Sequence, residues 1–346
     1  LRKFKEAEIW YDKGFKMEPE NIIGHHNHAF FLLALQQYNK AWIEYEYRLI
    51  RSPKLTQNLT HNDIRHKLWN GGGLEGQKIL VMREQGAGDE ILYSSMYKEL
   101  KKLYPDIIFE ADPRLIPIFN RSFGFKLIPA NKISANKKTL NNIDTIIFAG
   151  SLGRILRQKK ENFPKITKYL IPNKELVKKI KSRLDKINDK PKIGISWFSK
   201  NKRIGGGKSI DLKGLLPFLS IKEVSYVNLQ YDDHKNEIQK LKKETGINII
   251  DLDDIDKFDD FESLAALIQS LDLFITVSNT TAHLSGAIGK ETWVMAPKND
   301  SLLFYWNTGE NITPWYSTAK IYPKTDSWDN TISSVKSDLE KWLKNY

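Results

Sequence analysis

The sequence contains no cysteine and no apolar run long enough to cross a bilayer. Without cysteine, disulfides and thiolate metal ligands are excluded, and a reducing compartment is compatible with the chain. A membrane span needs about 20 consecutive apolar residues, and no segment approaches that length. The chain begins at Leu1 with charged residues and no hydrophobic signal core, so we expect the natural amino terminus to lie further upstream. We predict a cytoplasmic protein without a transmembrane segment.

The 346 residues carry a net charge of +12, which raises the question of nucleic-acid binding. The positive charge is concentrated between Arg157 and Lys192, where 13 Lys and Arg stand against 4 Asp and Glu. Within this region the segment Lys174 to Lys190 has an apolar residue at every turn, so it predicts an amphipathic helix with a solvated lysine face. No zinc-finger, homeodomain or RNA-recognition pattern accompanies it, and we predict no nucleic-acid partner.

The first 55 residues contain an internal repeat with a period of 34 residues. Five pairs of similar residues share this offset: Phe4 and Tyr38, Ala7 and Ala41, Ile9 and Ile43, Tyr11 and Tyr45, Pro19 and Pro53. This is the period of tetratricopeptide repeats, which are helix–turn–helix units. Asn27 to Gln36 supplies a further helix, and the alternative is a generic helical hairpin. Because such repeats need neighbours to bury their faces, we expect either further repeats before Leu1 or docking on the next domain.

Strands and helices alternate through the rest of the chain, which predicts two doubly wound α/β domains with parallel sheets. We place tetratricopeptide-like helices at 1–55, a linker at 56–76, one Rossmann-like domain at 77–188, a second at 189–328 and a closing helix at 329–346. In the first domain we expect strands Lys78–Met82, Ile107–Glu110, Lys126–Ile128 and Thr145–Phe148, with helices Glu90–Leu103 and Leu115–Arg121. In the second we expect strands from Lys192, at Ser225–Leu229 and at Asn248–Ile250, with helices Leu212–Leu219 and His234–Glu244.

The most informative stretch runs from Phe261 to Pro297. It reads as a helix, the buried strand Leu273–Val277, a polar turn, the helix Ala282–Ile288 and the strand Thr292–Met295. Small hydroxyl and amide residues that open a helix after a parallel strand can bind phosphate, because the helix presents unpaired N–H groups and a positive dipole end. The residues predicted to form this site are Ser278, Asn279, Thr280, Thr281 and, one turn into the helix, His283.

A second loop of interest, Glu84 to Glu90, reads EQGAGDE. Gln85, Gly86 and Gly88 form a segment in which glycine lets the backbone approach a ligand. Asp89 lies at the start of the following helix, where its carboxylate could take a proton from an incoming hydroxyl. The alternative is that Asp89 only caps the helix, a contribution of about 1 kcal/mol. The spacing favours neither reading.

The loop Ser199 to Ser209 follows the first strand of the second domain and is rich in lysine and glycine. It is not a P-loop, because that motif needs glycine at Lys202. Its Lys202, Arg203, Lys208 and Ser209 can nevertheless reach a diphosphate, and the alternative is a plain surface loop. Gln230, at the end of another strand of this domain, is a possible base or ribose contact.

Two other segments have plausible structural readings. Asp251 to Glu262 holds seven acids in twelve residues, and its Asp-x-Asp could hold a divalent metal. We favour the reading in which these acids suit a helix start, and we predict no metal site. The aromatic residues Trp306, Trp315 and Tyr316 could wall a cleft and stack on a base or sugar, although a core position is as plausible.

These motifs together resemble a known group of enzymes. The segment 260–297 is similar to the donor-site signature of bacterial glycosyltransferases related to the ADP-heptose lipopolysaccharide heptosyltransferases, and REQGAGDEILYSS is similar to their acceptor-side loop. The order of repeats, AWIEYEYRL, EQGAGDE and PWY resembles bacterial tetratricopeptide-repeat glycosyltransferases over nearly the whole chain. Many relatives have Asp-Thr where this chain has Ser278–Asn279.

The resemblance implies a GT-B fold with an acceptor domain and a donor domain, and it implies an inverting, metal-independent transfer from a nucleoside-diphosphate sugar without a further cofactor. It assigns Asp89 as general base, Lys202, Arg203 and Lys208 as donor-phosphate contacts, and the segment from Thr280 to His283 as the phosphate-holding helix start. We expect a protein or peptide acceptor recruited by the repeats. The alternatives are a lipopolysaccharide or surface-glycan acceptor, or a non-catalytic interaction protein.

Overall fold

The computed structural model describes residues 4–51, 66–133, 140–200, 205–297, 302–306 and 311–346. It forms two compact units, which are not consecutive halves of the chain. Unit 1 consists of residues 1–86, 96–112 and 127–164, and unit 2 of residues 87–95, 113–126 and 165–346. No helix among the described residues is both long enough and apolar enough to span a membrane.

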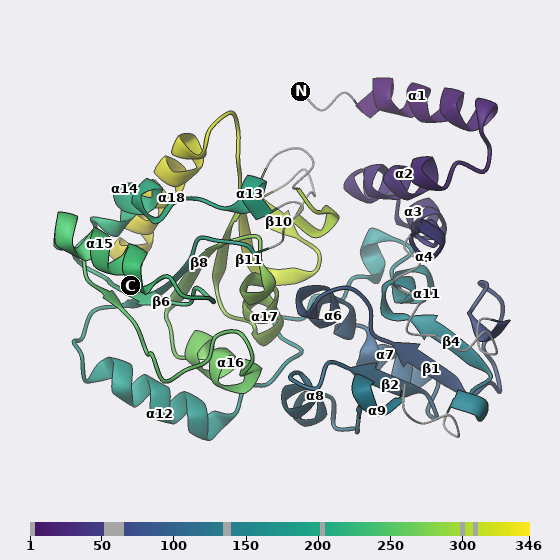
Figure 1. Cartoon of the computed structure of the whole chain (residues 1–346), viewed down its shortest axis with the longest axis horizontal. Coiled ribbons are helices and arrows are strands. Elements are labelled where there is room, and N and C mark those ends of the chain that lie inside the picture. Colours follow the sequence, from purple (N-terminus) through teal and green to yellow (C-terminus); the bar gives the residue numbers. More distant parts are fainter. Residues whose placement is uncertain (1–3, 52–65, 134–139, 201–204, 298–301, 307–310) are drawn as a thin grey trace. The chain divides into compact units, whose positions relative to one another are not determined.

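Unit 1 opens with four helices (Figure 1). Their bounds are α1 Phe4–Met17, α2 Ile22–Ala34, α3 Tyr38–Tyr45 and α4 Tyr47–Arg51. Helix α2 begins earlier than the predicted Asn27, because the Asn21 side chain caps it by accepting a hydrogen bond from the Gly24 N–H at 2.7 Å. Helices α1 and α3 start 34 residues apart, in keeping with the repeat, while Pro53 lies outside the described residues. Assignment to the tetratricopeptide class stays a prediction.

The sheet of unit 1 has the order β3-β2-β1-β4, and all its pairings are parallel. Its strands are β1 Ile79–Met82, β2 Ile108–Ala111, β3 Ile128–Pro129 and β4 Thr145–Phe148. The central strands read as continuous apolar runs, ILVM and TIIF, and every residue in them is buried. The described helices after β1 in this unit are α7 Tyr97–Leu103, α9 Ala130–Ile133 and α11 Leu152–Leu156.

The predicted helix Glu90–Leu103 is wrong as a single element. It is two helices, α6 Ala87–Ser94 and α7 Tyr97–Leu103, separated at Ser95 and Met96. The hydroxyls of Ser94 and Ser95 donate to the carbonyls of Ile91 and Leu92, at 2.8 and 2.7 Å. Such serine back-bonding competes with the helical ladder and accompanies the break here. The break has a consequence for the site, because α6 belongs to unit 2 and α7 to unit 1.

Unit 2 contains a seven-stranded sheet with the order β10-β11-β9-β8-β5-β6-β7. All neighbours are parallel except β10 and β11, an antiparallel pair that the sequence reading missed. Strands β8 and β9 lie in the middle, as their buried apolar composition predicts. The bounds are β5 Lys192–Ser196, β6 Ser225–Asn228, β7 Ile249–Ile250, β8 Leu273–Val277, β9 Thr292–Ala296, β10 Ile312–Thr313 and β11 Tyr316–Pro323.

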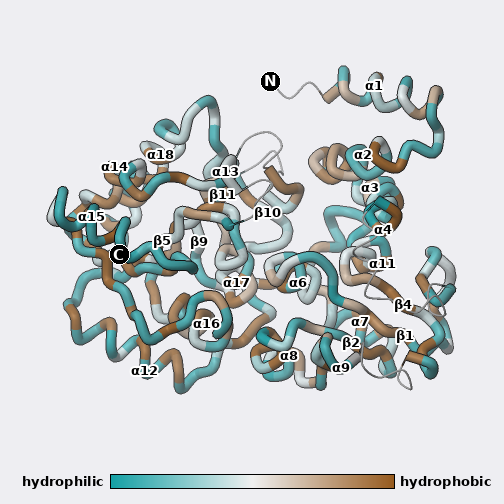
Figure 2. Tube along the Cα trace, in the orientation of Figure 1, coloured by the Kyte–Doolittle hydropathy of each residue, from teal (hydrophilic) through white to brown (hydrophobic). Residues whose placement is uncertain are grey.

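Helices cover both faces of this sheet. Figure 1 shows α12 and α16 on one side and α14, α15 and α18 on the other. Alternate strand residues such as Ile193 and Ile275 pack with apolar residues of α14, α15 and α18 in one core cluster. Figure 2 shows α12 alternating between hydrophilic and hydrophobic residues, as a surface helix should. The bounds are α8 Ile116–Phe123, α12 Lys174–Asp185, α13 Gly205–Lys208, α14 Leu216–Leu219, α15 Lys235–Thr245, α16 Phe261–Gln269, α17 Thr280–Ile288 and α18 Trp328–Asn345.

The prediction of an α/β chain with two Rossmann-like parts, preceded by helices, is confirmed. The compact units divide the chain differently from the predicted ranges, because the amino-terminal helices belong with the first sheet. Three segments before residue 189 belong with the second sheet. They contain the helices α6, α8 and α12. The predicted closing helix is present as α18, and its Ile332, Val335 and Leu339 are buried. The domain ranges themselves stay a prediction.

Candidate functional site

Helix α17 begins at the carboxyl end of β8, within unit 2. Asn279 is its N-cap, and its side-chain oxygen accepts a hydrogen bond from the Ala282 N–H at 3.1 Å. The same side chain donates to the hydroxyl of Ser196, at the end of β5, at 2.8 Å. The cap therefore fixes the start of α17 against the neighbouring strand. The N–H groups of Thr280 and Thr281 precede the capped one, in the first turn where a helix attracts anions.

Helix α6 packs against the start of α17. A Cβ atom added at Gly88 would lie 3.0 Å from Cδ2 of His283 and 3.4 Å from Cα of Thr280. Glycine at this position therefore permits the close approach of the two helices. Asp89, the next residue, is half-buried in the first turn of α6. The structure thus brings the predicted base and the predicted phosphate-holding segment together in one compact unit.

Lys208 completes this cluster from the loop after β5. It is buried, and burial lowers the pKa of its ammonium to about 8, while the nearby Asp89 carboxylate acts to raise that pKa. The described end of the loop is the short helix α13. This helix needs glycine at position 205, because a Cβ atom there would lie 2.2 Å from the Ser199 carbonyl oxygen. Lys202 and Arg203 lie outside the described residues.

His283 lies on α17 in an aromatic enclosure formed by Tyr305, Trp306 and Tyr316. Its Nδ1 and the Tyr316 hydroxyl are hydrogen-bonded at 2.8 Å. Burial, followed by the positive charge of Lys208, lowers the pKa of His283 to about 3, so the ring is neutral at physiological pH. His283, which was predicted to join the site, is therefore present as a neutral imidazole. A neutral imidazole attracts phosphate far less than a charged one.

The aromatic segment pointed out in the sequence is buried around α17. Tyr316 opens strand β11 and packs on Gly286, where an added Cβ would lie 2.5 Å from the tyrosine ring. The indole N–H of Trp306 donates to the hydroxyl of Ser278 at 3.0 Å. Both rings are almost fully buried, and so is Trp315. These buried aromatic residues are part of the core around α17. Their stacking on a base or sugar stays a prediction.

Other predicted site residues hold the backbone in place. The Gln230 side-chain oxygen accepts from the Ser196 hydroxyl and from the N–H groups of Trp197 and Phe198, at 2.9 to 3.0 Å. The Ser209 hydroxyl accepts from the Ser199 N–H and donates to the Gly205 carbonyl. Both side chains thereby shape the loop after β5. Their proposed contacts with the donor stay predictions.

The remaining predicted loop residues, Gln85 and Gly86, belong to unit 1. Gln85 has a positive φ of 61°, which is uncommon for a residue other than glycine. Its Nε2 donates to the Tyr45 hydroxyl at 3.0 Å. The side chain of Gln85 is therefore held by helix α3. Its backbone has a conformation that residues other than glycine seldom adopt.

A small pocket of about 200 Å³ lies beside the start of α17, entirely within unit 2. The Arg114 guanidinium lies over the rings of Phe258 and Phe261, at 5.6 and 5.4 Å. Tyr231, Lys200 and Lys257 add polar groups to the wall, and Thr280 and Thr281 connect it to the helix start. An aromatic wall next to the predicted phosphate-holding segment suits a nucleobase. The sequence reading missed Arg114, Tyr231 and Phe258, because they come from three separate loops.

The acidic segment after β7 is engaged in protein contacts. The Asp251 carboxylate accepts from the Lys257 ammonium at 2.8 Å and from the Asn228 side chain at 2.9 Å. Asp260 caps α16 by accepting from the Ser263 N–H at 3.0 Å. These contacts agree with the helix-start reading of this segment. Among the described residues, no group of three or more potential metal ligands comes together.

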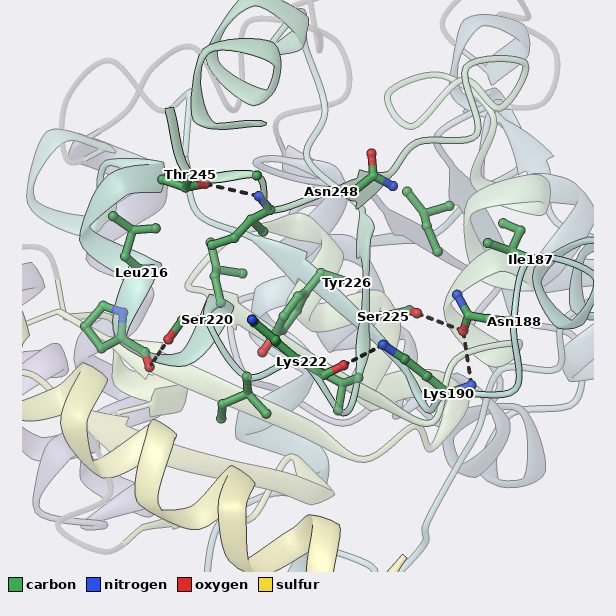
Figure 3. A pocket seen from close by; sticks show the side chains of 17 residues that line it. Ile187, Asn188, Lys190, Leu216, Ser220, Lys222, Ser225, Tyr226, Thr245 and Asn248 are labelled. Atoms are coloured by element: carbon green, nitrogen blue, oxygen red, sulfur yellow. Dashed lines mark hydrogen bonds between the residues drawn. The ribbon is translucent and has the colours of Figure 1, made fainter. Parts of the chain in front are cut away.

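A larger hollow of about 920 Å³ lies at the edge of the same sheet, next to β6 and β7 (Figure 3). The Lys190 ammonium donates to the Lys222 carbonyl across it at 2.7 Å, and the Ser225 hydroxyl donates to Asn188 at 2.9 Å. Ser225 and Asn248 place this hollow at the amino ends of the strands. Ligands of parallel α/β sheets bind at the carboxyl ends, so the smaller pocket beside α17 is the better candidate.

No family model matches the chain. Protein FlbA of Caulobacter vibrioides is 29% identical over 327 residues, covering 90% of this chain and 54% of that protein. The chain thus spans about half the length of this curated relative. ADP-heptose LPS heptosyltransferase II of E. coli superposes with a TM-score of 0.54 at 14% identity, over 78% of this chain and 99% of that one. A glycosyl transferase family 9 protein of Veillonella parvula gives 0.55 at 15%, over 78% and 93%. These structural likenesses show that the chain shares their two-part α/β fold, which is the predicted GT-B fold.

Proposed function

We propose that this protein is a glycosyltransferase that moves a sugar from a nucleoside-diphosphate sugar to an acceptor hydroxyl. The observation that carries the proposal is the convergence of Asp89, Lys208 and the start of α17 within unit 2. A carboxylate, a buried cation and unpaired helix N–H groups are the parts that such a transfer needs. The fold shared with two glycosyltransferase structures supports it.

The donor binds across the pocket and the helix start in this proposal. The base occupies the aromatic pocket beside Arg114 and Phe258. The diphosphate lies on the first turn of α17 and next to Lys208, whose partly desolvated charge attracts an anion strongly. Lys202 and Arg203 are proposed to add further positive charge. These groups supply a positive field at the leaving group, and the proposal therefore includes no metal and no further cofactor.

The chemical step is a single displacement. Asp89 accepts the proton of the acceptor hydroxyl as its oxygen forms a bond to the anomeric carbon. The bond between that carbon and the β-phosphate oxygen breaks, and its electron pair leaves with the nucleoside diphosphate. Lys208 and the α17 N–H groups stabilise the negative charge that develops there. Because the attack and the departure occur on opposite faces, the anomeric configuration inverts.

The acceptor in this proposal is a protein or peptide. The helices α1 to α4 resemble repeat units, and repeat arrays present surfaces that bind peptides. A surface glycan is the second candidate, favoured by the fold shared with a lipopolysaccharide heptosyltransferase. To separate the two, the protein is incubated with cell lysate and radiolabelled nucleotide sugar, and label is counted in the protein and lipid fractions. Label confined to lipid would defeat the protein acceptor.

Replacement of Asp89 tests the catalytic proposal. Asp89→Asn keeps the size and polarity of the side chain but removes the base, so turnover should fall about 10²- to 10⁴-fold. Asp329→Asn is the matched control, because Asp329 also lies in the first turn of a helix in unit 2. The melting temperatures of both variants should stay near that of the parent protein. Unchanged turnover in Asp89→Asn would remove Asp89 from the mechanism, and no turnover of any nucleotide sugar by the parent protein would favour a non-catalytic interaction protein.

A further inference from the structure

Helix α1 is held in unit 1 by aromatic contacts that include two histidines of α2. None of its 14 residues is buried, and it lies beside α2 at the amino-terminal end of the unit (Figure 1). Tyr11 of α1 contacts the ring of His28, with centroids 4.6 Å apart, and Phe15 stacks on His25 at 4.3 Å. A single helix of this length is marginal in water. The helical state of α1 therefore depends on these contacts.

His25 lies in the middle of a stack of three rings from three helices. Its imidazole stacks on Phe15 of α1 at 4.3 Å and on Tyr47 of α4 at 4.1 Å, with 13° between the ring planes in both cases. Two rings cannot stack on the same face of an imidazole, so they cover opposite faces. The face of an aromatic ring is negative and attracts a cation. The stack therefore favours a positively charged His25 over a neutral one.

Both nitrogens of His25 face groups that accept hydrogen bonds. Nδ1 lies 2.6 Å from a carboxylate oxygen of Glu44 in α3, and Nε2 lies 2.7 Å from the carbonyl oxygen of Pro19, in the turn between α1 and α2. A carbonyl and an ionised carboxylate only accept. Burial acts to raise the pKa of Glu44, but His28 and His25 outweigh it and lower that pKa, which keeps the carboxylate ionised. Both hydrogen bonds therefore form together only when His25 carries two protons.

We propose that protonation of His25 docks α1 onto α2, and that loss of the proton releases α1 while the sheet of unit 1 stays folded. A neutral imidazole has one N–H group, so it donates to Pro19 or to Glu44 but not to both. It also loses the attraction between a cation and the two stacked rings. The hydrogen bond to Pro19 fixes the turn that joins α1 to α2. Its loss therefore acts on α1 before any other element.

The groups around His25 define the pH range of this device. Burial acts to lower the pKa of His25, but the hydrogen bonds with Pro19 and Glu44 outweigh it and raise that pKa above 6.5. The stabilisation of the docked state is therefore fully present below pH 6.5 and is lost as the pH rises through the pKa of the folded protein. The other titratable groups that face this stack are Tyr11 of α1, Glu20 of the turn, His28 of α2, Glu44 of α3 and Tyr47 of α4.

These neighbours do not reverse the effect. Burial raises the pKa of Tyr11 and of Tyr47, so both hydroxyls stay neutral where His25 titrates. Glu20 adds a negative charge that favours the imidazolium. Nδ1 of His28 lies 3.7 Å from the second Glu44 oxygen, which is too far for a hydrogen bond. His25 is thus the histidine that holds the carboxylate.

The protonation state is measured by nuclear magnetic resonance on protein labelled with ¹⁵N-histidine. The chain has 7 histidines, and His25→Gln identifies the signals of His25. We expect both ring nitrogens to be protonated below pH 6.5 and the titration midpoint to lie above 6.5. Glu44→Gln removes the anionic partner and should lower the midpoint. A midpoint below 6.5, or one that Glu44→Gln leaves unchanged, would overturn the proposal.

The docking of α1 is measured by hydrogen exchange and mass spectrometry, with rates corrected for the pH dependence of unstructured peptides. Peptides from residues 4–17 report on α1, and peptides from β1 and β4 report on the sheet. The protection of α1 should fall about tenfold for each pH unit between 6.5 and the His25 midpoint. The protection of β1 and β4 should stay constant. Constant protection of α1, or an equal loss in the sheet, would overturn the proposal.

Two variants make the test specific to His25. In His25→Gln the protection of α1 should be low at every pH, because glutamine does not titrate. The matched control is His26→Gln, in the next residue of α2. Nδ1 of His26 lies 2.6 Å from the Arg51 guanidinium, which only donates, so His26 does not carry two protons while this bond is present. This variant should keep the pH dependence of the parent protein, and its loss there would overturn the role of His25. No sugar nucleotide is used, so the outcome is independent of the proposed function.

Discussion

Lys208 is a residue whose burial has opposite consequences for stability and for binding. Its folded pKa of about 8 lies below the ordinary value of 10.5. At any pH at which the lysine of the unfolded chain is protonated, the lower pKa in the folded state reduces the free energy of unfolding. The penalty is fully present below pH 8 and disappears as the pH rises from 8 towards 10.5. A buried cation kept at such a cost is typical of a site that binds an anion.

We expect Lys208→Met to raise the free energy of unfolding at pH 7 by up to about 3 kcal/mol. The gain should shrink between pH 8 and pH 10, because the parent protein loses its penalty there. The same variant should bind ADP at least tenfold more weakly. Urea unfolding at several pH values and calorimetric titration measure the two effects, with the exposed Lys213→Met as control. A variant less stable than the parent at pH 7 would contradict the assignment.

Gly88 is a second residue at which the contact between α6 and α17 can be tested. Alanine normally favours a helix over glycine by about 0.5 to 1 kcal/mol. At Gly88 the new methyl group would lie 3.0 Å from a histidine ring that three aromatic side chains enclose. Because His283 cannot retreat, we expect Gly88→Ala to lower both the melting temperature and the turnover of the sugar nucleotide.

Gly14→Ala is the control for this substitution, since nothing lies within 4 Å of an added Cβ in helix α1. It should stabilise the protein slightly or leave it unchanged. A Gly88→Ala protein with the melting temperature and turnover of the parent would show that α6 has room to move away from α17.

Among the elements of unit 1, α4 is joined to the end of β1 by a buried ion pair. The Arg48 guanidinium donates to the Glu84 carboxylate at 3.1 Å and to the Ser151 hydroxyl at 2.9 Å. Burial raises the pKa of Glu84, while the charge of Arg48 opposes that rise. A Cβ at Gly150 would lie 1.8 Å from the carboxylate, so glycine is needed there. The helical segment and the sheet therefore form one packed unit.

Breaking this pair should destabilise unit 1. Arg48→Met leaves a buried carboxylate without its cation and should cost about 3 to 5 kcal/mol. The double variant Arg48→Met/Glu84→Leu should recover much of that loss, because neither charge then remains buried. Urea unfolding of the two single variants and the double variant measures the coupling. Additive losses would show that the two side chains do not depend on each other.

The elements show where sequence reasoning succeeds. Strands β4 and β8 have the predicted bounds, because each β-branched apolar run follows an aspartate, and the runs end before Ala149-Gly150 and before Ser278. Helix α17 begins two residues before the predicted Ala282, since Asn279 caps it. The break between α6 and α7 was missed, because a helical pattern continues through Ser95 and Met96. The antiparallel pair β10 and β11 was missed, and β10 is only two residues long.

The site could be predicted only where its residues follow one another in the chain. Asp89 and the segment from Ser278 to His283 each lie within one local motif. Arg114 and Tyr231 reach the pocket from loops far apart in sequence, and no local pattern distinguishes them from core or surface residues. The same limit applies to Gln230, whose position at a strand end suggested a ligand but whose side chain holds the β5 loop.

At the scale of the whole molecule, the proposed transfer needs an acceptor surface as well as a donor site. Helix α1 buries none of its residues, and its Ile9 and Trp10 are 54% and 64% exposed. On the neighbouring helix α2, Ile23 is 58% exposed. In the proposal, these exposed apolar residues of the repeat-like segment are candidates for contact with a protein acceptor. This agrees with the proposed protein acceptor.

We expect Trp10→Ser to raise the KM for a protein acceptor about tenfold, because a tryptophan at the centre of an interface commonly contributes this much. The affinity for ADP and the melting temperature should stay unchanged, since the ring is not part of the core. Ile312→Ser, which removes an equally exposed apolar side chain from β10 of unit 2, is the control and should leave the acceptor KM unchanged. Steady-state kinetics with the labelled acceptor measures both variants. An unchanged KM in Trp10→Ser and in Ile9→Ser would show that the acceptor binds elsewhere, and it would leave the donor site and its chemistry untouched.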